Sequence, residues 1–224
     1  DDAMSGAAAA FEALLRTTSD DPLPPEQELH STVRRYAEQG GDLDATGGEF
    51  GSTLTSLASM RGLTPTVRLL ADLRADVHKP RNDGQRPIQH AAKHGHLDTA
   101  RLLLQLRADV NAQENGGRTA CWAAAFRGHD RVVRLLISAR ASFIAGHNGS
   151  TPVYIAAQEG HDRVIVTLAQ ARASIDTPSN AITPITRAHG YQRDTLVRLL
   201  AYMGANLLQP DGRGFWDSHD TPNP

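Results

Sequence analysis

Residues 81–113 read RNDGQRPIQHAAKHGHLDTARLLLQLRADVNAQ and contain one complete structural unit, from which the fold can be inferred. Its Asn-Asp-Gly at 82–84 favours a turn, since glycine tolerates a positive φ and Asn and Asp side chains bond to their own backbone. Pro87 fits the first turn of a helix, where its missing N–H costs nothing. An isoleucine and two alanines within 88–92 give that helix a small apolar stripe, and Gly95 is predicted to end it as a left-handed cap.

The second half of the unit predicts another short helix. Residues 97–106 place Leu102, Leu103 and Leu106 on one side of that helix. Neither helix reaches the ~12–15 residues that an isolated helix needs to be stable in water. The small alanines of the first helix let the two helices approach closely. Each unit must therefore bury its apolar face against the next one.

The same landmarks recur along the chain at a nearly constant spacing, which is the signature of a repeat protein. The string Arg107-Ala108-Asp109-Val110 repeats Arg74-Ala75-Asp76-Val77 after 33 residues, and related strings begin at Arg140, Arg172 and Gly204 after steps of 33, 32 and 32. Two other landmarks move by the same steps. They are the residue pairs at 53–54, 86–87, 119–120, 151–152 and 183–184, where the first helix starts, and the apolar pairs at 69–70, 102–103, 135–136, 167–168 and 199–200. Only Thr167 breaks the apolar pair.

The repeated unit resembles the ankyrin repeat, a 33-residue motif with a T-P-L-H-x-A signature. Residues 150–161, STPVYIAAQEGH, match it most closely, followed by RPIQHAAKHGH at 86–96. The resemblance implies an all-α fold, an α-solenoid of stacked helix-turn-helix repeats with short β-turn fingers. It predicts five ankyrin repeats in residues 48–208, with boundaries at 48–80, 81–113, 114–145, 146–177 and 178–208.

Both ends of the chain are predicted to close the stack, as terminal units of repeat arrays do. Residues 1–47 are expected to form an N-terminal helical cap, a degenerate repeat with helices at 7–16 and 26–39. Residues 209–224 are expected to form a C-terminal capping finger and a tail, with Phe215 and Trp216 covering the last helix pair.

The sequence departs from the family where the second helix ends. The family has glycine before Ala-Asp, but this chain has Arg74, Arg107, Arg140 and Arg172 at four of the five positions. A non-glycine residue in the left-handed conformation costs on the order of 1 kcal/mol. Arginine at a helix C-terminus regains ~0.3–1 kcal/mol from the helix dipole. We therefore expect the replacement to be tolerated, with a small change in cap geometry.

The composition excludes several classes of function. The 224 residues carry 23 Lys and Arg against 25 Asp and Glu, so a net charge of −2 gives no global field to hold nucleic acid or an anionic membrane. No apolar run approaches the ~18 residues that span a bilayer. The single cysteine, Cys121, excludes an internal disulfide and any multi-cysteine metal site. It also favours a cytoplasmic or organellar location over secretion.

Candidate catalytic groups are sparse. His90 and His94 have zinc-like spacing on one helix, with His96 and Asp98 nearby, but the other ligands of a complete metal site are missing. Cys121 occupies a repeat position that is otherwise apolar, so it is predicted to be a core residue. We therefore expect no enzyme activity, no catalytic residues, no metal site and no cofactor.

The residues that vary while the repeat frame stays constant are the candidates for binding. In ankyrin architecture the fingers and the exposed positions of the first helices form a concave surface. Mapped onto this chain, the resemblance predicts these partner-binding residues: Phe50, Met60, Arg61, Asn82, Asp83, Lys93, His94, Asn115, Arg118, Trp122, Phe126, Arg127, His147, Asn148, Gln158, Glu159 and Tyr191.

The middle repeat carries the most distinctive part of this set. Arg118, Phe126 and Arg127 are expected to come together, and an aromatic side chain with two arginines is typical of binding hot spots. Trp122 lies one helical turn before Phe126. It either extends this patch or packs between neighbouring repeats, since tryptophan is usually mostly buried.

Together these features predict a non-enzymatic protein–protein interaction module. It would act as a scaffold or adaptor, or as an accessory structural subunit of a larger assembly, and bind its partner through the concave ankyrin groove. The expected partners are other proteins, with no nucleic acid and no insertion into a membrane. Two alternatives remain open: a regulatory ankyrin domain of a longer enzyme or channel, and a metal-dependent enzyme built on His90, His94 and Asp98.

Overall fold

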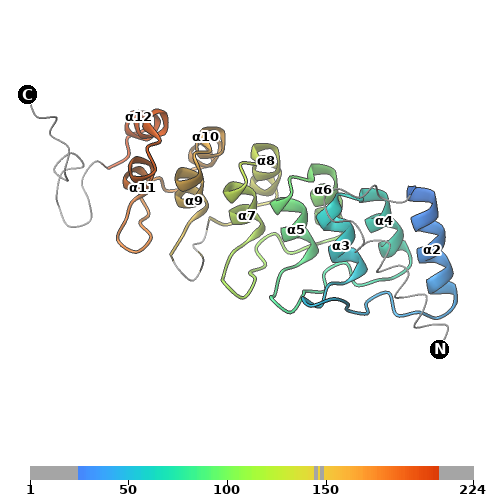
Figure 1. The fold of residues 1–224 in the computed structure, drawn as a ribbon. Helices are drawn as coiled ribbons and strands as arrows, with labels where there is room; N and C mark the ends of the chain where they lie inside the picture. The colour runs from blue at the N-terminus through green and yellow to red at the C-terminus, as the bar shows by residue number, and fades with distance from the viewer. Residues whose placement is uncertain (1–24, 144–145, 147–148, 207–224) are drawn as a thin grey trace, which may run out of the picture. The chain divides into compact units, whose positions relative to one another are not determined.

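The computed structural model describes residues 25–143, 146 and 149–206. The predicted helix at 7–16, the C-terminal finger with Phe215 and Trp216, and the site residues His147 and Asn148 lie outside the described residues. The described part of the chain forms eleven helices (Figure 1). They are α2 (Glu26–Glu38), α3 (Leu54–Arg61), α4 (Thr64–Asp72), α5 (Pro87–Lys93), α6 (Leu97–Gln105), α7 (Ala120–Phe126), α8 (Asp130–Ser138), α9 (Pro152–Glu159), α10 (Asp162–Gln170), α11 (Pro184–Gly190) and α12 (Asp194–Tyr202).

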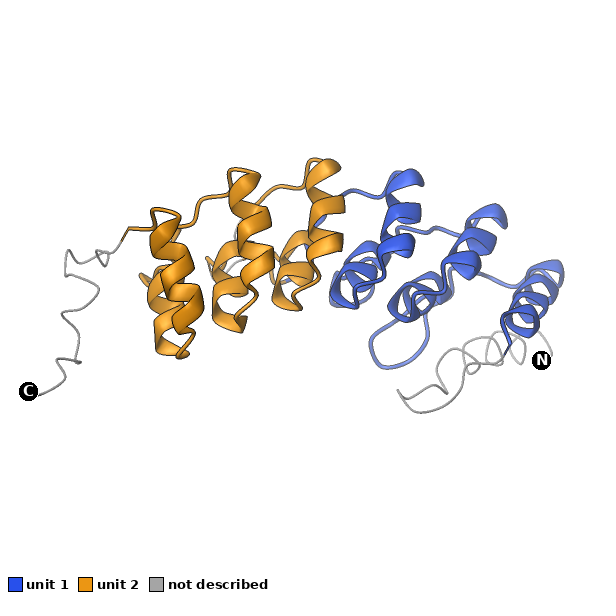
Figure 2. Ribbon diagram, turned by 90° about the horizontal axis from the view of Figure 1, so that it is seen from above, with its two compact units in different colours: residues 1–115 blue, residues 116–224 orange. Residues whose placement is uncertain are grey.

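The chain divides into two compact units, residues 1–115 and 116–224 (Figure 2). In unit 1, α3 packs on α5 and on its own partner α4, while α4 lies between α2 and α6. In unit 2, α9 lies between α7 and α11, and each of these three helices packs on the helix that follows it in the chain. Within each unit the first helices of the pairs thus form one layer and the second helices form another.

Threonine starts four of the five first helices. The hydroxyl oxygens of Thr53, Thr119, Thr151 and Thr183 each accept a hydrogen bond from the backbone N–H three residues later. Such caps satisfy donors that the first turn of a helix leaves without partners. α5 begins after Arg86 instead, and there the Gln89 side-chain oxygen accepts the Arg86 backbone N–H at 2.7 Å. The first helices therefore start where the sequence predicts.

The second helices end on arginines in the left-handed conformation. Arg74, Arg107, Arg140 and Arg172 have φ values of 70°, 71°, 65° and 63°. The N–H of Arg74 donates to Ala71 O and the N–H of Ala75 donates to Leu70 O, both at 3.0 Å. The same pair of bonds follows α6, α8 and α10. These Schellman motifs match the geometry that glycine gives elsewhere, so arginine is accommodated without a change in the cap.

The one polar lapse in the apolar pairs has a structural reason. Thr167 of α10 is buried, and its hydroxyl donates to the Asp130 carboxylate at the start of α8, with 2.5 Å between the oxygens. Arg134, one turn along α8, donates to the other carboxylate oxygen at 3.0 Å. Burial opposes ionisation of Asp130, but these hydrogen bonds and the charges of Arg134 and Arg163 hold its pKa below the usual range.

The fingers are tight turns rather than strands. Gly47 and Ser52 form an isolated antiparallel bridge in unit 1, and Ser179 and Ile182 form another in unit 2. No longer strand occurs in the part of the chain that the structure describes. The described architecture is therefore stacked helix pairs with short β-turn fingers, as the sequence predicts.

Candidate functional site

In unit 1 the predicted finger residues bind to one another. The N–H of Asn82 donates to Phe50 O at 3.1 Å, and the N–H of Asn115 donates to Asp83 O at 3.0 Å. The side-chain amide of Asn115 also donates to Asn82 O at 3.2 Å. Asn82, Asp83 and Asn115 therefore hold successive fingers in register, whatever else they contact.

Phe50 is an exposed aromatic candidate in unit 1. Its side chain is 55% exposed at the tip of the first finger. The guanidinium carbon of Arg81 lies 4.8 Å from the centre of its ring. The Arg81 guanidinium lies also 3.9 Å from the Asp83 carboxylate. The finger tip thus presents an exposed aromatic ring with the Arg81 guanidinium over it.

The other unit 1 candidates gather at the C-terminal ends of α3 and α5. Met60 and Arg61 end α3, whereas Lys93 ends α5 and the exposed His94 caps it. The ring of His94 is stacked on that of His96, with 6.1 Å between centroids. His96 in turn donates from Nε2 to Met60 O at 3.0 Å, which ties the two helix ends together.

His90 lies beneath this surface instead of on it. Its side chain is 2% exposed, and its Nε2 atom has no hydrogen-bond partner. Desolvation by burial lowers the pKa of His90 to about 3, aided by the charges of Arg81, His94 and Lys93. Among the described residues, no group of three His, Cys, Asp or Glu side chains is placed to hold a metal ion.

In unit 2 four predicted residues form one continuous row along α7, which we call the arginine–aromatic row: Arg118, Trp122, Phe126 and Arg127. The rings of Trp122 and Phe126 stack nearly parallel, 11° apart, with 5.5 Å between centroids. Arg118 lies 5.2 Å from the centre of the Trp122 ring, and Arg127 lies 5.1 Å from that of Phe126. Both arginines are exposed and both rings are partly buried. A spacing of four residues relates Arg118, Trp122 and Phe126, and Arg127 extends the row as the residue that directly follows α7.

Trp122 contacts both the arginine–aromatic row and the neighbouring repeat. Its indole N–H donates to the Ser150 hydroxyl of the next repeat at 3.2 Å. Its other contacts, with Phe126 and Arg118, belong to the arginine–aromatic row. The backbone is anchored too, because His161 Nε2 donates to Phe126 O at 3.1 Å. Hydrogen bonds with the next repeat therefore hold the row in place.

A second cluster joins α9 and α11. The Arg187 guanidinium lies 5.1 Å from the centre of the Tyr154 ring and 5.8 Å from that of Tyr191, and its Nε–H donates to the Tyr154 hydroxyl. Tyr191 is 50% exposed, whereas Tyr154 is buried. At the end of α9, the Gln158 amide donates to the Glu159 carboxylate at 3.0 Å.

Comparison with known families decides what these repeats are. The family model for ankyrin repeats (many copies) matches residues 54–104 and 88–137, and the one for ankyrin repeats (3 copies) matches residues 121–211. The chain belongs to the ankyrin-repeat family. A search of curated proteins found no match. The ankyrin assignment confirms the predicted fold class, and it makes the chain a protein–protein interaction module.

Some residues that contact the predicted site residues were not predicted from the sequence. Arg81 and Arg187 were not predicted, although Arg81 lies over the Phe50 ring and Arg187 over the ring of Tyr154, which was not predicted either. Arg187 lies four residues before Tyr191, so helical spacing could have found that pair, whereas its contact with Tyr154 is one residue out of step with the 32-residue repeat. Arg81 has no comparable signal, because its contact depends on how the finger turns.

The predicted core cysteine is confirmed. Cys121 lies on α7 and is fully buried in the core, and this burial raises the pKa of its thiol to about 12. A thiol that stays protonated at neutral pH is a poor nucleophile. No helix in the described ranges has the length and apolar character to cross a bilayer.

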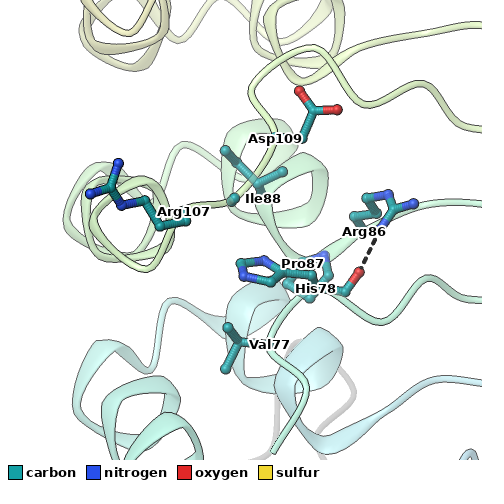
Figure 3. A pocket seen from close by; sticks show the side chains of 8 residues that line it. Val77, His78, Arg86, Pro87, Ile88, Arg107 and Asp109 are labelled. Carbon is teal, nitrogen blue, oxygen red and sulfur yellow. Dashed lines mark hydrogen bonds between the residues drawn. The ribbon is translucent and has the colours of Figure 1, made fainter.

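The ankyrin fold also leaves a cavity in unit 1 that the sequence did not predict (Figure 3). Its volume is about 210 Å³. Arg86 and His78 flank it, and both are engaged: Arg86 donates to His78 O at 2.9 Å, and His78 Nε2 donates to Leu106 O at 3.0 Å. The remaining lining residues are Val77, Pro87, Ile88, Arg107, Ala108 and Asp109.

Proposed function

We propose that this ankyrin-repeat chain is a non-enzymatic scaffold or adaptor, or an accessory subunit of a larger assembly, that binds a partner protein through its first helices and fingers. The observation that carries the proposal is the arginine–aromatic row of unit 2. Tryptophan and arginine are the residue types most enriched in binding hot spots, and they dominate the energy of an interface when they lie together.

The geometry of the row supports binding rather than folding as its main task. Arg118 and Arg127 are exposed, so their removal leaves no buried cavity. The stacking and the Trp122–Ser150 hydrogen bond hold the two rings in one orientation before any partner arrives. Such preorganisation reduces the entropy that side chains lose on binding.

In unit 1 we propose that Phe50, Met60, Arg61, Lys93 and His94 contact the partner. They lie at the finger tip and at the ends of α3 and α5, where Phe50 and His94 are exposed and the other three are partly exposed. Asn82, Asp83 and Asn115 act mainly by keeping the fingers in place, because their backbone or side-chain groups bond to the neighbouring finger.

The test compares partner capture by the wild-type chain with capture by the double variant Phe126→Ala with Arg127→Ala. Proteins crosslinked to the wild-type chain in its native cell extract should lose at least about tenfold in yield with the variant, since a hot-spot residue contributes ~2 kcal/mol or more. The melting temperature should change by less than about 4 °C.

Arg131→Ala provides the matched control, because Arg131 is an exposed arginine on α8, a second helix. Capture by this variant should equal capture by the wild type. If the double variant captures as much protein as the control, the first helices of unit 2 are not the binding surface. The same conclusion follows if the melting temperature of the double variant falls together with its capture yield, because the two residues then act in folding.

A further inference from the structure

The charges on the first helices of unit 2 are not balanced. Arg118, Arg127 and Arg187 lie with the aromatic side chains of α7, α9 and α11, and Glu159 is the acidic residue among them. The whole chain, by contrast, has a net charge of −2. Residues 116–206 carry ten arginines against five Asp and Glu residues, so the excess of positive charge belongs to unit 2 as a whole, its first helices included.

The arginines are oriented by rings. Arg118 and Arg127 each lie about 5 Å from the centre of a ring, one at each end of the Trp122–Phe126 stack. A guanidinium has five N–H donors, two of which can bind one carboxylate in a bidentate arrangement while its carbon lies over a ring. The row thus presents an arginine, then two aromatic rings, then a second arginine.

Arg187 repeats the arrangement on the next helices. Its Nε–H is used by the buried Tyr154, and its guanidinium lies also against the exposed ring of Tyr191. Glu159 stands on α9, the helix between α7 and α11. A positively charged side chain of a partner would therefore be repelled by three arginines and attracted by one carboxylate, that of Glu159.

We propose that unit 2 binds an acidic polypeptide segment in which carboxylates flank an apolar side chain. This inference rests on the function proposed above and names the chemistry of the partner. The apolar side chain lies on the Trp122 and Phe126 rings, and carboxylates pair with Arg118 and Arg127. A further carboxylate pairs with Arg187, and Glu159 opposes the segment by like-charge repulsion.

The experiment selects binders from a random peptide library displayed on phage, with the full chain as the immobilised target. Enriched peptides are sequenced, synthesised and measured by fluorescence anisotropy at low and high salt. Enrichment of Asp and Glu around an apolar residue, with affinity that falls as salt rises, is the expected result.

Variants then locate the site. Arg127→Gln and Arg118→Gln should each weaken the selected peptide about fivefold, as expected for an exposed charge pair, and Glu159→Gln should strengthen it about twofold or more. Arg131→Gln on α8 removes the same charge elsewhere and should leave the affinity unchanged.

Different failures have different meanings. Neutral or basic peptides that still require Phe126 would overturn the acidic-segment inference and leave the proposed function standing. Selected peptides that ignore Phe126, Arg118 and Arg127, or no enrichment at all, would count against both. A uridine oligonucleotide that binds more tightly than the best peptide, and loses binding with Arg127→Gln, would replace the acidic segment with a nucleic acid.

Discussion

The Nδ1 atom of His96 lies 2.5 Å from the position that a Cβ atom would take on Gly62. Gly62 follows α3 with a φ of 72°, and His96 belongs to the next repeat, where it donates from Nε2 to Met60 O. The glycine thus allows the left-handed end of one helix and the close approach of the next repeat. Gly128 and His161 stand in the same relationship in unit 2, with 2.6 Å between His161 Nδ1 and the Cβ position.

The first prediction concerns this glycine. Gly62→Ala should destabilise the protein by about 2–3 kcal/mol, of which about 1 comes from the left-handed backbone and the rest from displacing the His96 ring. Gly40→Ala is the control, because Gly40 ends α2 with a φ of 77° and has open space around its Cβ position. Urea denaturation should show a loss of only about 1 kcal/mol for the control. Equal losses would mean that His96 moves aside without cost.

The arginine caps give the second prediction. Arg74 is exposed and has a φ of 70°, so Arg74→Gly should remove strain and stabilise the protein by about 0.5 kcal/mol after the loss of the favourable dipole contact. The measurement is the urea midpoint at a constant slope.

The reciprocal change tests the same cause. Gly204 occupies the equivalent position after α12, with a φ of 86° and no atom within 4 Å of its Cβ position. Gly204→Arg should therefore lower the stability by a similar amount. Should Arg74→Gly also lower it, the arginine side chains stabilise the folded state by more than the backbone strain costs.

The sequence predicted the helix pairs well because each signal for them is local. Thr151 caps its own helix, Pro152 lies in the first turn, and Gly160 adopts the left-handed conformation directly after it. The row on α7 was predictable for the same reason, since Arg118, Trp122 and Phe126 are spaced by one helical turn.

What the sequence did not reveal depends on contacts between repeats. Thr167 looked like a lapse until α10 was placed beside α8, where its hydroxyl meets Asp130. The same holds for Arg187 and Tyr154, and for the His96 bond to Met60 O. A repeat spacing indicates which residues are equivalent, but the reach and rotamer of each side chain decide which neighbour it contacts.

The third prediction is a pH dependence caused by His90. Its pKa is about 3 in the folded state, against 6.5 for an ordinary histidine, so below pH 6.5 the unfolded chain binds a proton that the folded chain rejects. Stability should therefore fall as the pH drops from about 6.5 towards 3, and this residue should account for about 2 kcal/mol between pH 7 and pH 5.

His90→Leu isolates that effect from the other histidines, because Leu57 occupies the equivalent position in α3. The variant should lose about 2 kcal/mol less than the wild type between pH 7 and pH 5 in urea denaturation. His94→Gln removes one of the charges that lower the pKa of His90 but not its burial, so this variant should retain most of the wild-type loss. Parallel pH profiles for wild type and His90→Leu would show that the buried ring is not the group responsible.

The fourth prediction concerns the hydrogen bond from Thr167 to Asp130. Thr167→Val keeps the shape of the side chain and removes the donor, so it should cost about 1 kcal/mol at pH 7, although valine suits the apolar pair better. Because the pKa of Asp130 lies below its usual value of 3.8, the bond stabilises the folded state above that pH and loses strength as the carboxylate is protonated on acidification. In an Asp130→Ala background, Thr167→Val should have almost no effect on the urea midpoint. Additive losses in the double variant would show that the threonine acts through packing rather than through the carboxylate.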